Sequence, residues 1–233
     1  MSRPARGAGL AGRYVALAVV IALATGGCGA ASPPSPPSGV DELVIPTPSP
    51  DPSDFVRSVD NPWLALAPGA TRHYRVLGST DGTLVITVED STLDIAGVAT
   101  TPVSRTEPTG ERIVDYYAQD RQGNVWWFGR EGVWLAGEDG AEAGLAMPAH
   151  PRLGDGWRAA YGAGVVDVRA TVVTTDQVVT TPAGRFTHLV GIDLTSPLDQ
   201  DGSRRVFYGR GIGVVEEIST DGPIYLSELE SPS

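Results

Sequence analysis

The residue types that most often carry catalysis or bind metal ions are few and scattered in this chain. Its three histidines, His73, His150 and His188, lie far apart and form neither an HxH nor an HExxH pattern. No Gly-x-Ser-x-Gly segment, which presents the nucleophile of many serine hydrolases, is present. We therefore predict no catalytic residue, no metal site, no cofactor and no enzymatic activity. We expect His188 to be partly buried, because it shares a strand face with Phe186 and Val190.

Carboxyl groups are plentiful, but their spacing does not favour the paired acids of glycoside hydrolysis. Glu216 and Glu217 are adjacent, so their side chains point to opposite faces of a strand. Residues 199–203 begin like a calcium-binding loop, but Arg210 stands at the twelfth position, where an EF-hand needs a bidentate Glu. We interpret this segment as an acidic turn.

The single cysteine is the one chemically informative residue near the N-terminus. Because Cys28 is alone, the chain can form no intramolecular disulfide. Three arginines, an apolar run from about Tyr14 to Ala24 and three small residues precede it, which is the layout of a signal peptide. The apolar run is roughly a dozen residues long, whereas a membrane-spanning helix needs about 20.

The segment Ala24-Thr25-Gly26-Gly27-Cys28 resembles the lipobox of bacterial lipoproteins, although that family usually has Leu where Thr25 stands. The resemblance implies cleavage before Cys28 and a diacylglycerol on its sulfur. Two acyl chains hold a protein stably at a membrane, so the resemblance places the chain at the extracytoplasmic face of the cell membrane. An ordinary signal peptide followed by an unrelated cysteine is the alternative.

Composition divides the remainder of the chain. We predict a signal peptide over 1–27, the lipidated cysteine and a linker over 28–54, a β domain over 55–230 and a short tail over 231–233. The linker is rich in Pro and Ser, which favours extended polyproline II and cannot build a core. We interpret it as a spacer between membrane and domain.

Charge excludes one class of partner. Residues 1–27 hold three arginines and no acid, so the rest of the chain carries 14 arginines against 28 Asp and Glu. Nucleic-acid binding requires clustered positive charge along a phosphate backbone, so we predict no nucleic-acid partner. The expected membrane contact runs through the N-terminal lipid.

The β domain alternates apolar and polar residues with a period of two, as in 84–88 and 166–172. The fold class we predict is mostly β, with few short helices, the best candidates being 61–66 and 138–145. A weak repeat with a spacing of about 83 to 91 residues predicts two meanders joined into one long antiparallel sheet. Such a sheet should curl into a half-barrel, barrel-like form or sandwich.

The most distinctive run is residues 115–129, DYYAQDRQGNVWWFG. It resembles a hairpin found in a family of secreted bacterial proteins of unknown function, and residues 181–186 and 208–217 resemble that family's closing strands. The resemblance spans most of 61–219 and implies a fold and a location, with no known activity. In length, lipobox and strand content the chain also looks similar to envelope lipoprotein carriers, which cup acyl chains in a curved sheet.

The hairpin supplies the candidate ligand contacts. Trp126 and Trp127 must point to opposite faces of their strand, so one belongs to the core and the other meets solvent, a neighbour or a ligand. We predict Trp126, Trp127, Tyr116 and Tyr117 as candidate ligand-contact residues. The predicted function is a lipid-anchored envelope protein that binds an apolar or amphiphilic ligand, such as a hydrophobic small molecule or lipid. The alternative is a non-enzymatic structural or protein-interaction domain.

The lipid anchor is directly testable. Replacing Cys28 with Ala removes the sulfur that carries the lipid, so we expect the variant to leave the membrane fraction for the soluble fraction. Fractionation and immunoblotting measure the change. Continued retention of the Cys28→Ala variant in the membrane fraction contradicts the prediction.

Overall fold

The computed structural model describes residues 51–223 and 225–230, and these form one β domain. Its one helix is the 3-10 turn η1 (Pro52–Asp54), which Asp51 caps through its side chain. Across these two ranges, no helix has the length and apolar character needed to cross a bilayer. The predicted signal peptide, Cys28, linker residues 28–50 and tail residues 231–233 lie outside the described residues.

Fifteen strands are present in the described ranges, and all of them pair antiparallel. They are β1 (Phe55–Val56), β2 (Thr71–Gly78), β3 (Gly82–Val88), β4 (Leu93–Ile95), β5 (Val98–Thr106), β6 (Arg112–Asp120), β7 (Val125–Arg130), β8 (Trp134–Leu135), β9 (Glu142–Met147), β10 (Gly156–Gly162), β11 (Val166–Thr181), β12 (Gly184–Ser196), β13 (Asp199–Gly209), β14 (Gly213–Ser219) and β15 (Tyr225–Leu229).

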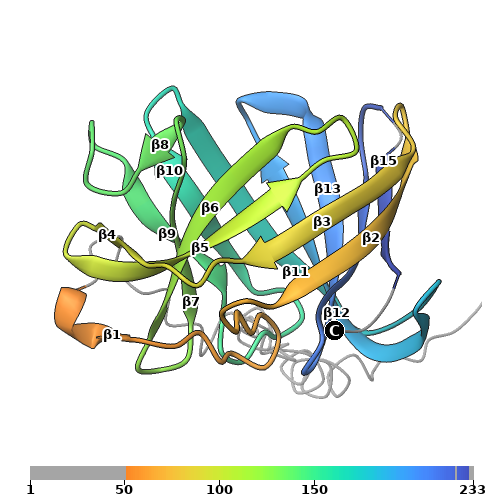
Figure 1. The fold of residues 1–233 in the computed structure, drawn as a ribbon, viewed down its shortest axis with the longest axis horizontal. Helices are drawn as coiled ribbons and strands as arrows, with labels where there is room; N and C mark the ends of the chain where they lie inside the picture. Colours follow the sequence, from red (N-terminus) through yellow and green to blue (C-terminus); the bar gives the residue numbers. More distant parts are fainter. Residues whose placement is uncertain (1–50, 224, 231–233) are drawn as a thin grey trace, which may run out of the picture. The chain divides into compact units, whose positions relative to one another are not determined.

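Twelve of these strands close into a barrel, as Figure 1 shows. The ring follows chain order through β2, β3, β5, β6, β7, β9 and then β10 to β15, and it closes where β15 pairs with β2. The prediction of a mostly β fold built on a long curved antiparallel sheet is confirmed. The first six and last six barrel strands form two meanders. Residues 116–117 and 207–208, which are separated by the repeat spacing, lie on the fourth strand of each meander.

The barrel has two distinct ends. Because neighbouring strands are antiparallel and follow in chain order, successive connections alternate between the ends. The connections after β3, β6, β9, β11 and β13 share one end, where residues 57–70 between β1 and β2 cross the barrel (Figure 1). We call residues 57–70 the plug, this end the plugged end, and the opposite end the mouth end.

Asn61 fixes the plug to the barrel. Its Nδ2 group donates to the carbonyl oxygens of Gly123 at 2.8 Å and Pro148 at 3.3 Å, in two different connections of the plugged end. Its backbone N–H donates to Oε1 of Gln119 at 2.7 Å. The side chain is buried, so it bonds to the protein where water cannot reach it.

The two segments predicted as short helices are not helical, and each has a local cause. In 61–66, Oδ1 of Asn61 accepts hydrogen bonds from the backbone N–H groups two and three residues later, as at a helix N-cap. The turn does not continue, because the N–H of Leu66 donates to the carbonyl oxygen of Val59 in an isolated β-bridge. In 138–145, Asp139 and Gly140 both have positive φ, at 47° and 75°, so the chain turns and then enters β9.

The segment 199–203, which we interpreted as an acidic turn, lies within β13. The chain reverses earlier, where Ser196 pairs with Asp199 across a two-residue turn, so the acidic segment continues as strand.

The interpretation of His188 as partly buried is wrong. Its side chain is 81% exposed and its Nδ1 lies 2.6 Å from Oδ1 of Asp176. The backbone of His188 adopts a φ of 57°, and the pairing of β11 with β12 shifts register in this stretch. That irregularity breaks the alternation, so Phe186 packs in a different cluster from Val190.

Apolar residues are buried on both faces of the barrel wall. The interior cluster lies toward the plugged end and includes Val59 and Leu66 of the plug. A second cluster covers the outer face of β6 and β7, beneath β1, β4 and β8. Its members are Ile95, Val98, Val114, Tyr116, Ala118, Trp126, Phe128, Ala136 and Ala143.

We expect Asn61→Ala to lower the free energy of unfolding by about 2 kcal/mol, because it leaves several buried backbone groups without partners. Urea denaturation measures the change. The exposed Thr175→Ala is the control and should alter the free energy of unfolding by less than about 0.5 kcal/mol. An Asn61→Ala variant as stable as this control contradicts the assigned role of the plug.

Candidate functional site

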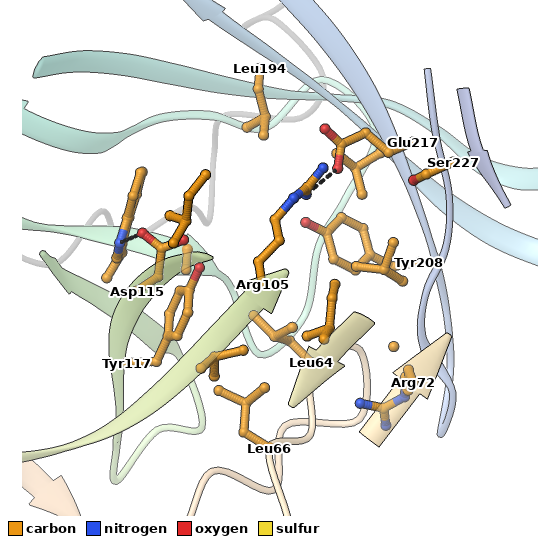
Figure 2. Close-up of a pocket in the computed structure, with 18 of the residues that line it drawn as sticks. Leu64, Leu66, Arg72, Arg105, Asp115, Tyr117, Leu194, Tyr208, Glu217 and Ser227 are labelled. Atoms are coloured by element: carbon orange, nitrogen blue, oxygen red, sulfur yellow. Dashed lines mark hydrogen bonds and ion pairs between the residues drawn. The ribbon is translucent and has the colours of Figure 1, made fainter. Parts of the chain in front are cut away.

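A cavity of about 270 Å³ lies inside the barrel between the plug and the mouth end. Most of its wall is aliphatic or aromatic, and Figure 2 shows Leu64 and Leu66 of the plug among the lining side chains. The apolar lining residues are Leu64, Ala65, Leu66, Tyr74, Leu84, Ile86, Val103, Ile113, Tyr117, Trp127, Ala146, Ala159, Val168, Leu194, Val206, Tyr208 and Val214.

Charged side chains also line the cavity. They are Arg72, Arg105, Glu107, Asp115, Arg130, Arg204 and Glu217. Strand alternation places most of them there, whereas register shifts in the pairing of β7 and of β14 turn Arg130 and Glu217 inward. On β6, for example, Asp115 and Tyr117 face the cavity, whereas Val114 and Tyr116 face the outer cluster. We call Arg105, Glu107, Asp115, Arg130, Arg204 and Glu217 the ionic belt.

Arg105 is the central member of the ionic belt. Its guanidinium pairs with Glu107, donates to the hydroxyl of Tyr225 and places Nη1 3.3 Å from Oε2 of Glu217. Arg105 and Glu217 lie 112 residues apart in sequence and point toward one another across the barrel interior (Figure 2). The contact joins the first meander to the second.

Asp115 and Arg130 form the second ion pair of the ionic belt. Nε and Nη2 of Arg130 donate to the two carboxylate oxygens of Asp115 at 2.8 and 3.0 Å, a bidentate arrangement. The indole N–H of Trp127 donates to the same carboxylate at 3.1 Å, and the guanidinium lies 5.3 Å from the centre of the indole ring. The indole is therefore held in a fixed orientation at the cavity wall.

Burial and charge set the pKa values of this site. Burial favours the neutral form of Glu217, but Arg105 and Arg204 outweigh it and lower the pKa of this carboxyl. Burial also opposes the charge of Arg105, yet Glu217, Tyr225 and Glu107 hold its pKa above the ordinary value. Burial also acts on the phenols of the cavity, where it raises the pKa of Tyr74 to about 12.

A second hollow, of about 290 Å³, opens at the mouth end. It shares Trp127, Arg130, Val168, Leu194 and Arg204 with the inner cavity, so the two adjoin. Its outer rim carries exposed aliphatic side chains from three connections, Val133, Val165 and Leu198, which are 55%, 56% and 53% exposed. The cavity therefore adjoins a hollow with an apolar rim.

The structure separates the four predicted ligand-contact residues into two pairs. Tyr117 and Trp127 line the cavity. Tyr116 and Trp126 lie in the outer cluster, where the indole N–H of Trp126 donates to Asp120 at 2.9 Å. The prediction that the two tryptophans face opposite sides is confirmed. The cavity thus gathers one Tyr and one Trp of the original four.

The arginines of the ionic belt were missed from the sequence. Arg105 alternates in phase with Val103 on its strand, a signal that marks an inward polar position. Arg130 shares the parity of the outward-facing Trp126 and Phe128, and it faces inward only because the pairing of β6 with β7 shifts register. The sequence holds no sign that Arg204 and Glu217 join them, because that requires the barrel to close. Among the described residues, no group of three or more His, Cys, Asp or Glu side chains gathers in a geometry that could hold a metal ion.

Comparison with known proteins shows little. No family model matches the chain, and no curated protein matches it significantly. A solved structure from Bacteroides fragilis, described as an exported protein with a YMCC-like fold, matches at 16% identity and a TM-score of 0.40, over 73% of this chain and 98% of that one. A protein from Parabacteroides distasonis described as a lipoprotein matches at 13% identity and a TM-score of 0.38, over 75% and 100%. At such scores neither likeness carries an argument about function.

The pKa shift of Glu217 predicts a pH dependence. Because its pKa is lower in the folded state, its contribution to stability is present above the unfolded value of about 4.3 and is lost as pH falls through the folded pKa. We expect Glu217→Gln to lower the free energy of unfolding by roughly 3 kcal/mol at neutral pH. Denaturation measured across pH should show this deficit shrinking below about pH 4.

The neighbouring Glu216 is the matched control. Burial and Glu228 raise its pKa, so its ionised form is disfavoured in the folded state at neutral pH. Glu216→Gln should therefore keep or raise stability at neutral pH, and the difference from the parent should vanish at acid pH. Equal losses for the two variants would contradict the assigned roles.

Proposed function

We propose that this chain is a lipid-anchored protein of the cell envelope that binds a small apolar or amphiphilic molecule inside its barrel. The observation that carries the proposal is the cavity, which combines an aliphatic and aromatic wall with a limited set of fixed polar groups. Small-molecule sites in proteins have this composition. The anchor rests on the lipobox resemblance around Cys28, which lies outside the described residues.

The mouth supports the same proposal. An apolar ligand needs a route that does not expose it fully to water. The second hollow leads from the exposed aliphatic rim of Val133, Val165 and Leu198 to the inner cavity. The opposite end is closed by the plug, so the ligand enters at the mouth end.

The proposal assigns no catalysis to the ionic belt. Each of its three carboxylates is paired with an arginine, and the pKa of Glu217 is lowered rather than raised toward neutrality. A general acid or base works best with a pKa near the working pH. The belt is suited to positioning and recognition.

The proposal is tested by uptake of hydrophobic molecules. The Cys28→Ala chain, free of the proposed lipid, should be purified from the soluble fraction of bacterial cells that export it. Its mass is measured by native mass spectrometry, and bound molecules are identified by mass spectrometry after organic extraction. We expect one bound hydrophobe per chain. A clean apo mass, with nothing taken up when hydrophobes are offered, contradicts the proposal and favours the alternative of a protein-interaction domain.

A blocking variant links uptake to the cavity. Leu194 lines both hollows, so Leu194→Trp should fill the passage and reduce occupancy about tenfold. Leu77→Trp makes the same replacement at an exposed position that lines neither hollow and should bind normally. Equal occupancy in both variants would place the bound molecule elsewhere.

A further inference from the structure

The cavity lining carries more positive than negative groups, although the chain as a whole is acidic. Four arginines and three carboxylates line it, while the net charge of the chain is −11. Each carboxylate already has an arginine partner, since Glu107 and Glu217 pair with Arg105 and Asp115 pairs with Arg130. The cavity therefore has more arginines than carboxylates to pair with them.

Arg204 is the arginine of the belt with the weakest partner. Its Nε lies 3.6 Å from Oε1 of Glu217, beyond hydrogen-bonding distance, and that carboxylate is also shared with Arg105. The Arg204 side chain is 40% exposed and lines both hollows. Its guanidinium thus lies where the inner cavity meets the mouth, with N–H groups left to donate.

Arg130 lies at the same junction, since it also lines both hollows. Its Nε and Nη2 are engaged by Asp115, which leaves Nη1 as a further donor. Guanidinium groups bind carboxylate and phosphate oxygens with short, charge-assisted hydrogen bonds. Both guanidiniums act electrostatically on Tyr117, so their remaining N–H groups lie in the same part of the cavity.

We propose that the ligand is a single-chain amphiphile with an anionic oxyanion head, which binds Arg204 and Arg130 at the junction while its apolar chain fills the inner cavity. This inference rests on the proposed function. The cavity of about 270 Å³ lies just below the usual range of roughly 300–1,000 Å³ for small-molecule sites, so it favours one apolar chain over a lipid with several.

The net charge of the chain makes the inference specific. A strongly acidic protein repels anions at long range, so nonspecific attraction does not favour an acid over a neutral amphiphile. Arg72, the remaining arginine of the lining, lies near the start of β2 and beside Gly213, at the plugged side of the cavity. A preference for acids that depends on Arg204 and not on Arg72 therefore locates the head at the junction.

The test compares heads on one chain length. Dodecanoate, dodecyl phosphate and dodecanol are titrated into the whole Cys28→Ala chain by calorimetry at about pH 8, where carboxyl groups are ionised. We expect at least one of the two anions to bind about tenfold more tightly than the alcohol. Which anion binds more tightly distinguishes a carboxylate from a phosphate as the natural head.

Three variants locate the head. Arg204→Gln should remove the advantage of the anion over dodecanol. Arg205→Gln is the matched control, because Arg205 adjoins Arg204 in sequence but does not line the cavity. Its Nη2 instead donates to Oδ2 of Asp193 at 2.9 Å, so this variant should keep the advantage of the anion. Arg72→Gln should also keep it.

The outcomes separate the inference from the function it rests on. Equal affinity for anion and alcohol in the parent chain overturns the inference and leaves the proposed function standing. The inference is also overturned, with the proposed function left standing, if the anion loses its advantage in Arg72→Gln but keeps it in Arg204→Gln. Failure of all three molecules to bind overturns the proposed function itself.

Discussion

Closure of the sheet is the constraint on which the rest of the structure depends. Once β15 pairs with β2, twelve strands enclose more space than their inward side chains can fill, since barrels of about eight strands are just filled. The chain fills the plugged end with residues 57–70 and the apolar cluster around them. Toward the mouth it places the ionic belt and leaves a cavity.

Stability alone does not explain the ionic belt. Removing paired charges from water costs several kcal/mol per ion, and well-packed apolar residues in their place are often neutral or stabilising. The belt nevertheless occupies the barrel interior, where Arg105 binds three groups at once. The proposed recognition of a ligand supplies a reason for this cost, because fixed guanidinium groups in a largely enclosed cavity discriminate between charged and neutral heads.

Much of the fold could be predicted from local pattern, and the site could not. Period-two alternation gave the strands, and the rule that neighbours face opposite sides separated Trp127 from Trp126. Which tryptophan faces inward depends on registers that sequence does not encode locally, because both faces of β6 and β7 are buried. The two helix predictions failed on non-local pairing and turns, as at Leu66, whose backbone N–H donates to Val59 instead of continuing a helix.

The two meanders are similar in layout but not in what they contribute to the site. The first supplies Arg105, Asp115 and Arg130, and the second supplies Arg204 and Glu217. The carboxylate of Glu217 reaches Arg105 only because the ring closes, so neither half contains a complete belt. A repeat of six strands alone would have an open edge and a half-exposed charge cluster. Joining the halves therefore creates the enclosed volume and the low-dielectric setting on which the proposed selection of a ligand by its arginines depends.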